Sequence, residues 1–263
     1  MTIHDRLSFA ENLARGAGEL ATTMRTARGG LDVQAKGPQD FVTAADLAVE
    51  KLIRTRIAAQ FPEDAVIGEE GGRHGNTAAG AVWIIDPIDG TTNFMRGLPD
   101  WAVSIACAID GEIVLGVICA PDYRQTLVGH LSDKPEARKN GKVLKTSSDG
   151  LAKNALVAVG WSPRTDFKEH ADLLEAIISK GGEYRRSGAA TIGLIGVASG
   201  SVDAYFERQL NLWDAAAGIA IIRAAGGVVE APAFTPELKT PAPFVALARA
   251  DHELADFLRL AVV

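Results

Sequence analysis

The sequence contains few cysteines. Only two occur among 263 residues, Cys107 and Cys119, and they fall on two predicted strands that a turn at residues 110–111 would join. In such a hairpin Cys107 would face Val114. Cys119 would face Ala102, so the two thiols would not be opposed and we expect no disulfide between them. We expect both side chains to be buried as small apolar groups.

The chain also lacks long apolar runs and an excess of basic charge. No run approaches the roughly 18 to 20 apolar residues that a membrane-spanning helix needs, and residues 1–6 lack the basic-then-apolar layout of a secretory signal. We therefore expect a cytoplasmic protein that contacts no membrane. The formal net charge of −6 argues against a nucleic-acid partner, because non-specific nucleic-acid binders usually carry a basic face.

The sequence does have the composition of a large folded core. Its 263 residues, 47% of them hydrophobic, are enough for one large domain or two closely packed ones. A change in the sequence pattern near residue 150 predicts an N-terminal α+β half, residues 1–150, and a C-terminal α/β half, residues 151–263. Apolar spacing predicts helices over 3–27, 46–60, 166–180, 187–199, 211–225 and 251–261. Short apolar runs predict strands over 31–36, 65–68, 81–85, 101–109, 112–120, 125–131, 155–159, 184–186, 202–206, 227–230 and 244–248.

The most informative stretch is residues 83–94, Trp-Ile-Ile-Asp-Pro-Ile-Asp-Gly-Thr-Thr-Asn-Phe. A buried strand is predicted to stop at Asp86, which a proline follows, and Asp89 comes three residues later. Gly90 then allows close backbone approach, and Thr91 and Thr92 can each cap a helix. Acidic oxygens suit Mg²⁺, and the N–H groups of a helix start suit phosphate. The stretch predicts a site for a metal-bound phosphate; an Asx-turn followed by a helix cap is the alternative.

Two earlier segments place acids at the ends of predicted elements. Asp46 begins a predicted helix, where it or Thr43 could be a simple cap. Glu69 and Glu70 directly follow a short predicted strand. Adjacent glutamates usually mark a solvated loop, but acids after a buried strand lie at the sheet edge where ligands collect in open α/β sheets.

The C-terminal half places small or acidic residues at comparable positions. Gly188, Ala189 and Ala190 open a predicted helix, where small side chains would let a ligand approach backbone N–H groups. Tight packing of that helix on a sheet explains their spacing equally well. Glu207 directly follows a predicted strand, and Asp214 lies in the first turn of a predicted helix, where it could simply complement the helix dipole.

The string at 83–94 resembles the signature of the inositol monophosphatase family, which are Mg²⁺-dependent, lithium-sensitive phosphatases. Residues 40–46 resemble that family's Asp-x-Val-Thr-x-x-Asp motif, residues 68–70 its Gly-Glu-Glu, and residues 213–218 its Trp-Asp-x-Ala-Ala-Gly. The resemblance implies an α+β fold, a layered α-β-α-β-α sandwich of the inositol monophosphatase and fructose-1,6-bisphosphatase type, and a homodimer. Residues 132–139 depart from the family's Gly-rich segment, which affects a peripheral hairpin and none of the implied metal ligands.

The same resemblance implies a role for each acid. Two or three Mg²⁺ ions would be held by Glu69, Asp86, Asp89, Asp214 and the backbone carbonyl of Ile88. The catalytic residues would be Asp46, Glu70 and Thr91, with Asp46 hydrogen-bonded to a threonine hydroxyl. The substrate would contact Gly90, Thr91, Gly188, Ala189, Ala190 and Glu207. None of the five histidines falls in these motifs.

These residues lead us to expect hydrolysis of a small phosphate monoester by metal-activated water. Myo-inositol monophosphate is the substrate we favour. Histidinol phosphate, adenosine 3′,5′-bisphosphate and fructose 1,6-bisphosphate are the alternatives on the same site. A binding role associated with transcription, of the kind found in some bacterial relatives, is an alternative from another class and would not need an intact metal site.

Overall fold

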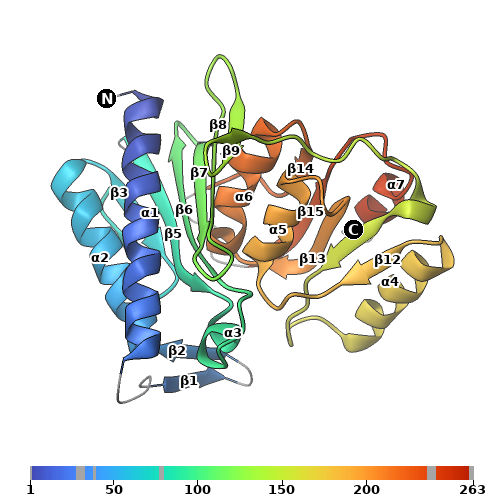
Figure 1. The fold of residues 1–263 in the computed structure, drawn as a ribbon, viewed down its shortest axis with the longest axis horizontal. Helices are drawn as coiled ribbons and strands as arrows, with labels where there is room; N and C mark the ends of the chain where they lie inside the picture. Colours follow the sequence, from blue (N-terminus) through green and yellow to red (C-terminus); the bar gives the residue numbers. More distant parts are fainter. Residues whose placement is uncertain (1, 28–32, 38–39, 77–79, 236–240, 261–263) are drawn as a thin grey trace.

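The computed structural model describes residues 2–27, 33–37, 40–76, 80–235 and 241–260, and it has a layered architecture (Figure 1). The first layer consists of two long helices, α1 (Ile3–Thr26) and α2 (Ala44–Gln60). A capping box between Thr2 and Asp5 begins α1. The sequence also predicts that Gly29 and Gly30 end this helix, and both lie outside the described residues.

An eight-stranded sheet forms the second layer. In spatial order its strands are β10 (Lys142–Val143), β9 (Glu136–Lys139), β8 (Gln125–His130), β7 (Glu112–Ala120), β6 (Ala102–Ile109), β5 (Ala81–Asp89), β3 (Ala65–Gly68) and β4 (Gly72–His74). Only β3 and β5 run parallel; the other neighbouring pairs are antiparallel. The predicted turn joins β6 to β7 with positive φ at Asp110 and Gly111, as a type I′ hairpin requires. A separate hairpin, β1 (Val33–Gly37) and β2 (Asp40–Thr43), precedes α2.

The two cysteines are buried and free, as predicted, but their cross-strand neighbours are not the predicted ones. Cys107 pairs with Leu115 and Cys119 pairs with Val103, each one residue away from the expected partner. The register of β6 against β7 shifts after Cys107, so that Val114 is the extra residue of a β-bulge. Alternation along the sequence does not reveal such an insertion. Burial raises the pKa of the Cys107 thiol to about 12.

Helices α5 (Ala190–Ala198) and α6 (Leu212–Ala224) form the middle layer and are buried on nearly every side. Glycines in the first sheet let α6 approach closely. A Cβ on Gly116 would lie 2.3 Å from the carbonyl oxygen of Ala217, and one on Gly129 would lie 2.6 Å from the Cα of Ile221. Because α6 is pressed onto this sheet, its first turn has a fixed position relative to β5 and β6.

A five-stranded sheet and two outer helices complete the fold. The strands are, in spatial order, β12 (Glu183–Arg185), β11 (Leu156–Val159), β13 (Ala204–Leu210), β15 (Ala242–Leu247) and β14 (Val228–Glu230). The outer face is covered by α4 (Phe167–Ser179) and α7 (Ala255–Leu260), and short helices α3 (Thr91–Met95) and η1 (Ala152–Asn154) lie in connections. The predicted α-β-α-β-α sandwich is therefore confirmed, and Figure 1 shows its layers from left to right.

Some predicted boundaries were wrong. The helix expected from residue 187 begins at Ala190, because Gly188 has a φ of +79° that no right-handed helix accommodates. The helix expected from residue 251 begins at Ala255. All strands of the first sheet precede residue 150 and all strands of the second follow it, and we keep the division into halves as a proposal. Among the described residues, no helix combines the length and apolar character needed to cross a membrane.

Candidate active site

Strand β5 carries two acids toward the middle layer. It was predicted to stop at Asp86, but it continues through Pro87 to Asp89, with a register shift against β6 between the two acids. Pro87 has no N–H to contribute to a ladder, so irregular pairing at this point costs no hydrogen bond from its nitrogen. Side chains three residues apart on a regular strand point to opposite faces. The irregularity lets Asp86 and Asp89 face the same space.

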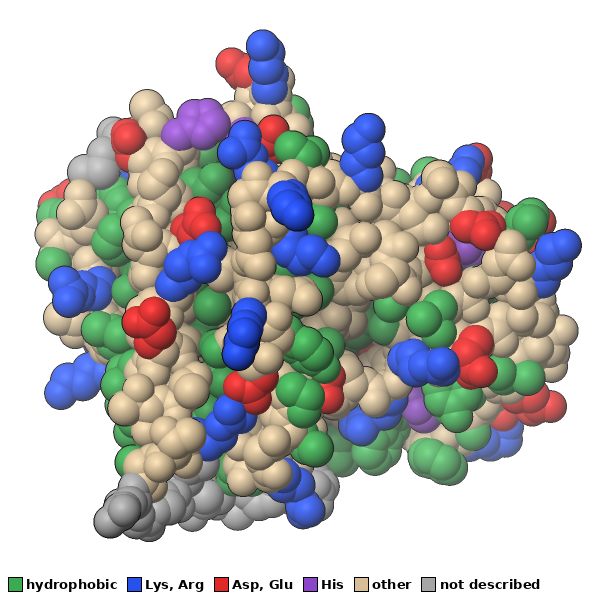
Figure 2. Space-filling view, in the orientation of Figure 1, with side chains coloured by type: hydrophobic (Ala, Val, Ile, Leu, Met, Phe, Trp, Pro, Cys, Tyr) green, Lys and Arg blue, Asp and Glu red, His purple; other side chains and the backbone are tan. Residues whose placement is uncertain are grey.

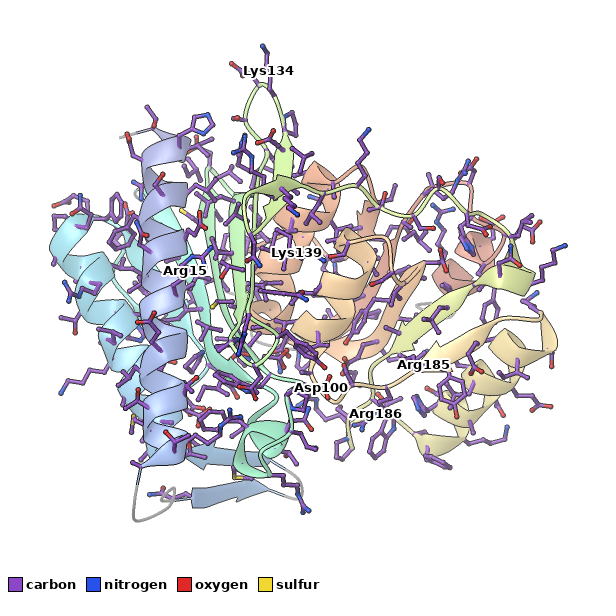
Figure 3. The ribbon with its side chains drawn as sticks, viewed as in Figure 1. Arg15, Asp100, Lys134, Lys139, Arg185 and Arg186 are labelled. Carbon is purple, nitrogen blue, oxygen red and sulfur yellow. The ribbon has the colours of Figure 1, made fainter. Side chains whose placement is uncertain are left out.

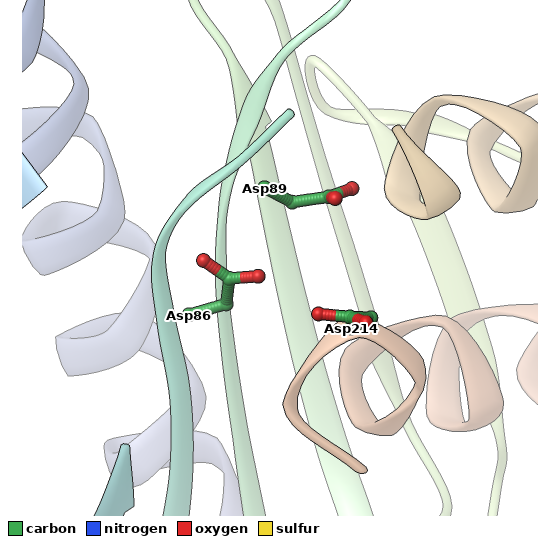
Figure 4. A group of neighbouring side chains, drawn as sticks. All are labelled: Asp86, Asp89 and Asp214. Carbon is green, nitrogen blue, oxygen red and sulfur yellow. The ribbon is translucent and has the colours of Figure 1, made fainter. Parts of the chain in front are cut away.

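Asp214 meets these two acids from the first turn of α6. Carboxylate oxygens of Asp86, Asp89 and Asp214 lie within 4.8 Å of one another, and Figure 4 shows the three side chains converging. Asn211, the N-cap residue of α6, donates a hydrogen bond from Nδ2 to Asp214 Oδ2 at 3.0 Å. Ser104, which pairs with Asp86 across the sheet, donates to the carbonyl oxygen of Trp213 at 3.2 Å. These contacts hold the start of α6 at the level of the β5 acids.

The three aspartates repel one another at a place where Asp86 is buried and Asp89 and Asp214 are half-buried. Burial raises the pKa of Asp86 well above its usual range, and the charges of Glu69, Asp214 and Asp89 raise it further. Burial, followed by the charges of Asp89 and Glu69, raises the pKa of Asp214 in the same way. A cation between the carboxylates would relieve both the repulsion and the cost of burial. The donor set consists of oxygens only, which suits a hard divalent cation such as Mg²⁺.

Glu69 lies beside this cluster. It follows β3, as predicted, and its backbone N–H donates to the carbonyl oxygen of Ile85 in β5 at 3.3 Å. Its charge acts on Asp86 and Asp214, although the group within 4.8 Å comprises the three aspartates. The structure thus gathers three of the four predicted acids tightly and places the fourth within electrostatic reach. The N–H of Glu70 is held by Glu50, a residue that sequence reasoning missed.

Asp46 serves as a helix cap and also reaches the candidate site. Its Oδ2 accepts hydrogen bonds from the backbone N–H and the hydroxyl of Thr43, at 2.9 and 2.5 Å, in a capping box at the start of α2. Its Oδ1 lies 3.3 Å from the Thr91 hydroxyl, which also lies 3.1 Å from the carbonyl oxygen of Ile88. The expected contact between Asp46 and a threonine hydroxyl is therefore confirmed. Burial is the main cause of a raised pKa at Asp46.

Gly90 forms the bend between β5 and α3. Its φ is +86°, and it is the N-cap of α3 with no side-chain cap, so neither of the two threonines expected to be able to cap a helix caps this one. A Cβ at this position would lie 2.7 Å from the carbonyl oxygen of Asp100 and 2.9 Å from the Cβ of Ala189. Nearby, Asn93 donates from Nδ2 to the carbonyl oxygens of Asp100 and Ser187, at 2.7 and 3.0 Å. These contacts tie the segment after β5 to the segment before α5.

Thr191, in the first turn of α5, fixes Asp89. Its backbone N–H and its hydroxyl both donate to Asp89 Oδ2, at 2.7 and 2.5 Å. These hydrogen bonds favour the charged carboxylate, but burial outweighs them and the pKa of Asp89 is raised. Sequence reasoning missed both Thr191 and Asn93. Thr191 bonds to Asp89 and Asn93 bonds to Ser187, each about a hundred residues away along the chain, and no local pattern marks such pairs.

A cavity of about 120 Å³ adjoins the aspartates. Its lining includes Asp89, Gly188, Ala189, Ala190, Glu207 and Asp214, so residues predicted separately to bind metal and substrate share one space. The lining also includes Arg185 and Arg186, which Figure 3 shows near the end of β12 that leads toward α5.

Glu207 is a buried acid in this cavity. It was expected to follow a strand, but β13 extends to Leu210 and so contains it. Tyr205 lies two residues earlier, hence on the same face of the strand, and donates its hydroxyl to Glu207 Oε2 at 2.5 Å. Burial raises the pKa of Glu207 to about 7. A Cβ on Gly160 would lie only 1.9 Å from this carboxylate, so only glycine leaves room for Glu207 in its present position.

Comparison with known proteins places these features in a family context. Residues 3–256 match the model of the inositol monophosphatase family. The protein named Nus factor SuhB from Pseudomonas aeruginosa is 35% identical over 229 residues, which cover 85% of this chain and 84% of the relative. The crystal structure of extragenic suppressor protein suhB from Bartonella henselae has a TM-score of 0.88 at 28% identity and covers 98% of each chain. The inositol monophosphatase of Anabaena has a TM-score of 0.84 at 27% identity, covering 100% of this chain and 98% of that one.

Proposed function

Since the chain belongs to the inositol monophosphatase family, we propose that it is a Mg²⁺-dependent phosphatase that hydrolyses small phosphate monoesters with water. The family supports a phosphatase, and the metal and the substrate are the proposal. The observation that carries it is the convergence of Asp86, Asp89 and Asp214 within 4.8 Å, with two of them lining the cavity that also contains Glu207. Carboxylates that lie this close and repel one another suit an anionic substrate only when cations lie between them.

The oxygen donors divide into two sets. Glu69, Asp86 and the carbonyl oxygen of Ile88 would hold one Mg²⁺ ion, and Asp86, Asp89 and Asp214 would hold a second, so that Asp86 belongs to both. We also propose that the same acids can hold a third ion. Bound ions would lower the pKa of a water molecule and stabilise the negative charge on the departing alcohol oxygen.

The residues around these acids would handle the proton and the phosphate. The Thr91 hydroxyl, held between Asp46 and the carbonyl oxygen of Ile88, would accept or relay the proton of the attacking water, with help from Glu70. Asp46 is fixed for this role by Thr43. The backbone N–H groups of Gly90 and Thr91 would hold phosphate oxygens. No side-chain nucleophile is required.

The cavity beside the aspartates would hold the alcohol part of the substrate. Glu207 would accept hydrogen bonds from its hydroxyl groups, and Gly188, Ala189 and Ala190 would contact its carbon skeleton and leave backbone groups accessible. The small volume of the cavity, about 120 Å³, together with a carboxylate at Glu207 that can accept hydrogen bonds from hydroxyl groups, favours a compact polyol. We propose myo-inositol monophosphate, with histidinol phosphate, a 3′,5′-bisphosphate nucleotide and fructose 1,6-bisphosphate as competing substrates.

A phosphate-release panel tests this assignment. The purified protein is assayed against these four substrates with Mg²⁺ and with a chelator, and kcat/KM is compared. We expect turnover only with Mg²⁺ and the highest kcat/KM with inositol monophosphate. A higher value with histidinol phosphate would overturn the choice of substrate, and turnover unaffected by the chelator would overturn the choice of mechanism. Gel filtration of the same sample tests the proposed homodimer.

A second candidate function is a binding role associated with transcription. The relative from Pseudomonas aeruginosa carries the name Nus factor SuhB. Although the net charge is −6, Figure 2 shows Lys and Arg side chains over the region of β8 and β9, and Figure 3 labels Lys134 and Lys139 there. Co-purification of transcription proteins with an Asp86→Asn variant would favour this role, because such binding would not need catalysis. Its loss on replacing Lys134 and Lys139 by Glu would locate the surface.

A further inference from the structure

The buried carboxylate of Glu50 takes no part in the chemistry proposed above. Glu50 lies in α2 and is 3% exposed. Its Oε2 accepts a hydrogen bond from the backbone N–H of Glu70 at 2.9 Å, and its Oε1 accepts one from the N–H of Gly71 at 2.6 Å. One helix side chain thus binds two successive N–H groups of the turn that joins β3 to β4.

Arg54, one turn further along α2, adds a second link between this helix and the same turn, and we call Glu50 and Arg54 together the clamp. The Nε of Arg54 lies 2.7 Å from Glu50 Oε1, and its Nη2 donates to the carbonyl oxygen of Gly72 at 2.5 Å. The backbone fits tightly around the pair: a Cβ on Gly71 would lie 2.6 Å from Glu50 Oε1, and one on Gly68 would lie 2.8 Å from Glu50 Oε2. The N–H groups of the turn and the carbonyl group of Gly72, the first residue of β4, are therefore both anchored to α2.

The clamped turn carries Glu69. The backbone N–H of Glu69 also bonds to Ile85 in β5, and its charge acts on Asp86 and Asp214. A buried ion pair adds little net stability, because the loss of hydration of two charges offsets their attraction. A well-packed apolar pair would hold two elements together as firmly, but it would not satisfy the N–H groups of a turn. The charged pair is therefore better explained by the position it imposes than by stability.

We infer that Glu50 is a positioning residue for the metal centre: it fixes the turn at residues 69–71 so that Glu69 faces Asp86 and Asp214. This inference rests on the metal site of the proposed function. It adds that the affinity for Mg²⁺ depends on a carboxylate that would not itself contact the ion. Partners of this kind typically change metal affinity by roughly 10- to 100-fold when they are altered.

Calorimetric titration of the metal-free protein with Mg²⁺, without substrate, tests the inference. In Glu50→Gln the amide keeps one acceptor but cannot receive both N–H groups and Arg54 as a carboxylate does. We expect Mg²⁺ to bind about 10- to 100-fold more weakly. In the phosphatase assay the Mg²⁺ concentration at half-saturation should rise by the same factor, while kcat at saturating Mg²⁺ returns close to the wild-type value.

Asp64→Asn is the matched control. Asp64 lies at the opposite end of β3, has a buried side chain, forms an ion pair with Arg6 and accepts a hydrogen bond from Trp83 Nε1 at 2.8 Å. Loss of the Asp64 carboxylate should lower the melting temperature and leave the affinity for Mg²⁺ unchanged. If Glu50→Gln does not fold, Arg54→Lys replaces it, since lysine keeps the positive charge but lacks the forked donors that join Glu50 to Gly72; a several-fold weaker Mg²⁺ affinity is expected.

Unchanged Mg²⁺ affinity in the folded variant would overturn the inference, and so would an equal loss of affinity in Asp64→Asn. The proposed function can fail separately. A wild-type protein that binds Mg²⁺ but releases no phosphate from the panel would refute the phosphatase assignment and leave the role of Glu50 intact. A wild-type protein that binds no Mg²⁺ would refute both.

Discussion

Replacing Asp86 by Asn should stabilise the metal-free protein while it abolishes catalysis. Asp86 lies 1% exposed among Asp89, Asp214 and the charge of Glu69. Asparagine has nearly the same shape, and its carbonyl oxygen can accept the N–H of Ile88 that Asp86 Oδ1 accepts at 3.0 Å. The substitution therefore removes a charge with little change in packing.

The expected gain follows from the spacing of the cluster. Two unit charges within 4.8 Å of each other repel by about 3.5 kcal/mol or more at an effective dielectric constant of 20. This destabilisation has an upper limit, because one carboxyl can take up a proton instead of remaining charged. Keeping a carboxyl with an ordinary pKa near 3.9 protonated at pH 7 takes about 4 kcal/mol. We therefore expect Asp86→Asn to raise the free energy of unfolding by about 2 to 4 kcal/mol without metal. For a chain of this size that corresponds to roughly 5 to 10 °C in Tm.

Thermal and urea unfolding at pH 7, with a chelator and with Mg²⁺, measure this effect. Mg²⁺ at 100 times its Kd should stabilise the wild type by about 2.7 kcal/mol and the variant far less. The difference in stability between the two proteins should therefore become smaller or change sign when Mg²⁺ is added. Asp166→Asn is the control: Asp166 caps α4 by accepting the N–H of Lys168, and asparagine caps equally well. An Asp86→Asn protein less stable than wild type in chelator would refute the account of a repulsive cluster.

Three further predictions concern the residues around the aspartates. Folding raises the pKa of Glu207 from 4.5 to about 7, so between these pH values the folded state keeps a proton that the unfolded state has lost. The free energy of unfolding of the wild type should therefore fall by about 3 kcal/mol as pH rises from 4.5 through 7. Urea unfolding of Glu207→Gln should lack this part of the pH dependence, and the same pH dependence in both proteins would contradict the prediction. Gly90→Ala should lower the free energy of unfolding by at least 1 kcal/mol and abolish most of kcat, because position 90 has a positive φ and an added Cβ would press on Ala189. A fully active variant would exclude the proposed phosphate contact. Thr191→Val should weaken Mg²⁺ binding about 10-fold in calorimetry by releasing Asp89, whereas unchanged binding would show that Asp89 needs no such support.

Much of the fold could be predicted because its signals are local. Apolar runs and the Asp110-Gly111 turn define the hairpin of β6 and β7 correctly. The predicted partners of Cys107 and Cys119 were wrong by one residue, because a bulge at Val114 leaves no mark in the alternation of side chains. Similarly, a proline after Asp86 predicted the end of a strand, whereas the strand tolerates it at an irregularity.

The candidate site depends on contacts between distant segments, which local patterns do not encode. The acids of β5 could be located from the strand that carries them. Asp214 could be joined to them only through the family resemblance, since its own context indicates no more than a helix start. Thr191 and Glu50 were missed because each acts by hydrogen bonds to a segment that its neighbours in sequence do not reveal. Sequence identifies the acids, and packing of α2, α5 and α6 determines how they are held.

The most direct test of the central claim is the position of divalent ions in crystals. Mn²⁺ is a suitable substitute for Mg²⁺ on oxygen ligands, and its anomalous scattering locates it without assumptions about the site. Crystals grown with Mn²⁺ should show strong peaks between Asp86, Asp89 and Asp214, with one ion also bound by Glu69. Crystals in which Mn²⁺ binds elsewhere, with these carboxylates left uncoordinated, would contradict the assignment of this cluster as the catalytic metal centre.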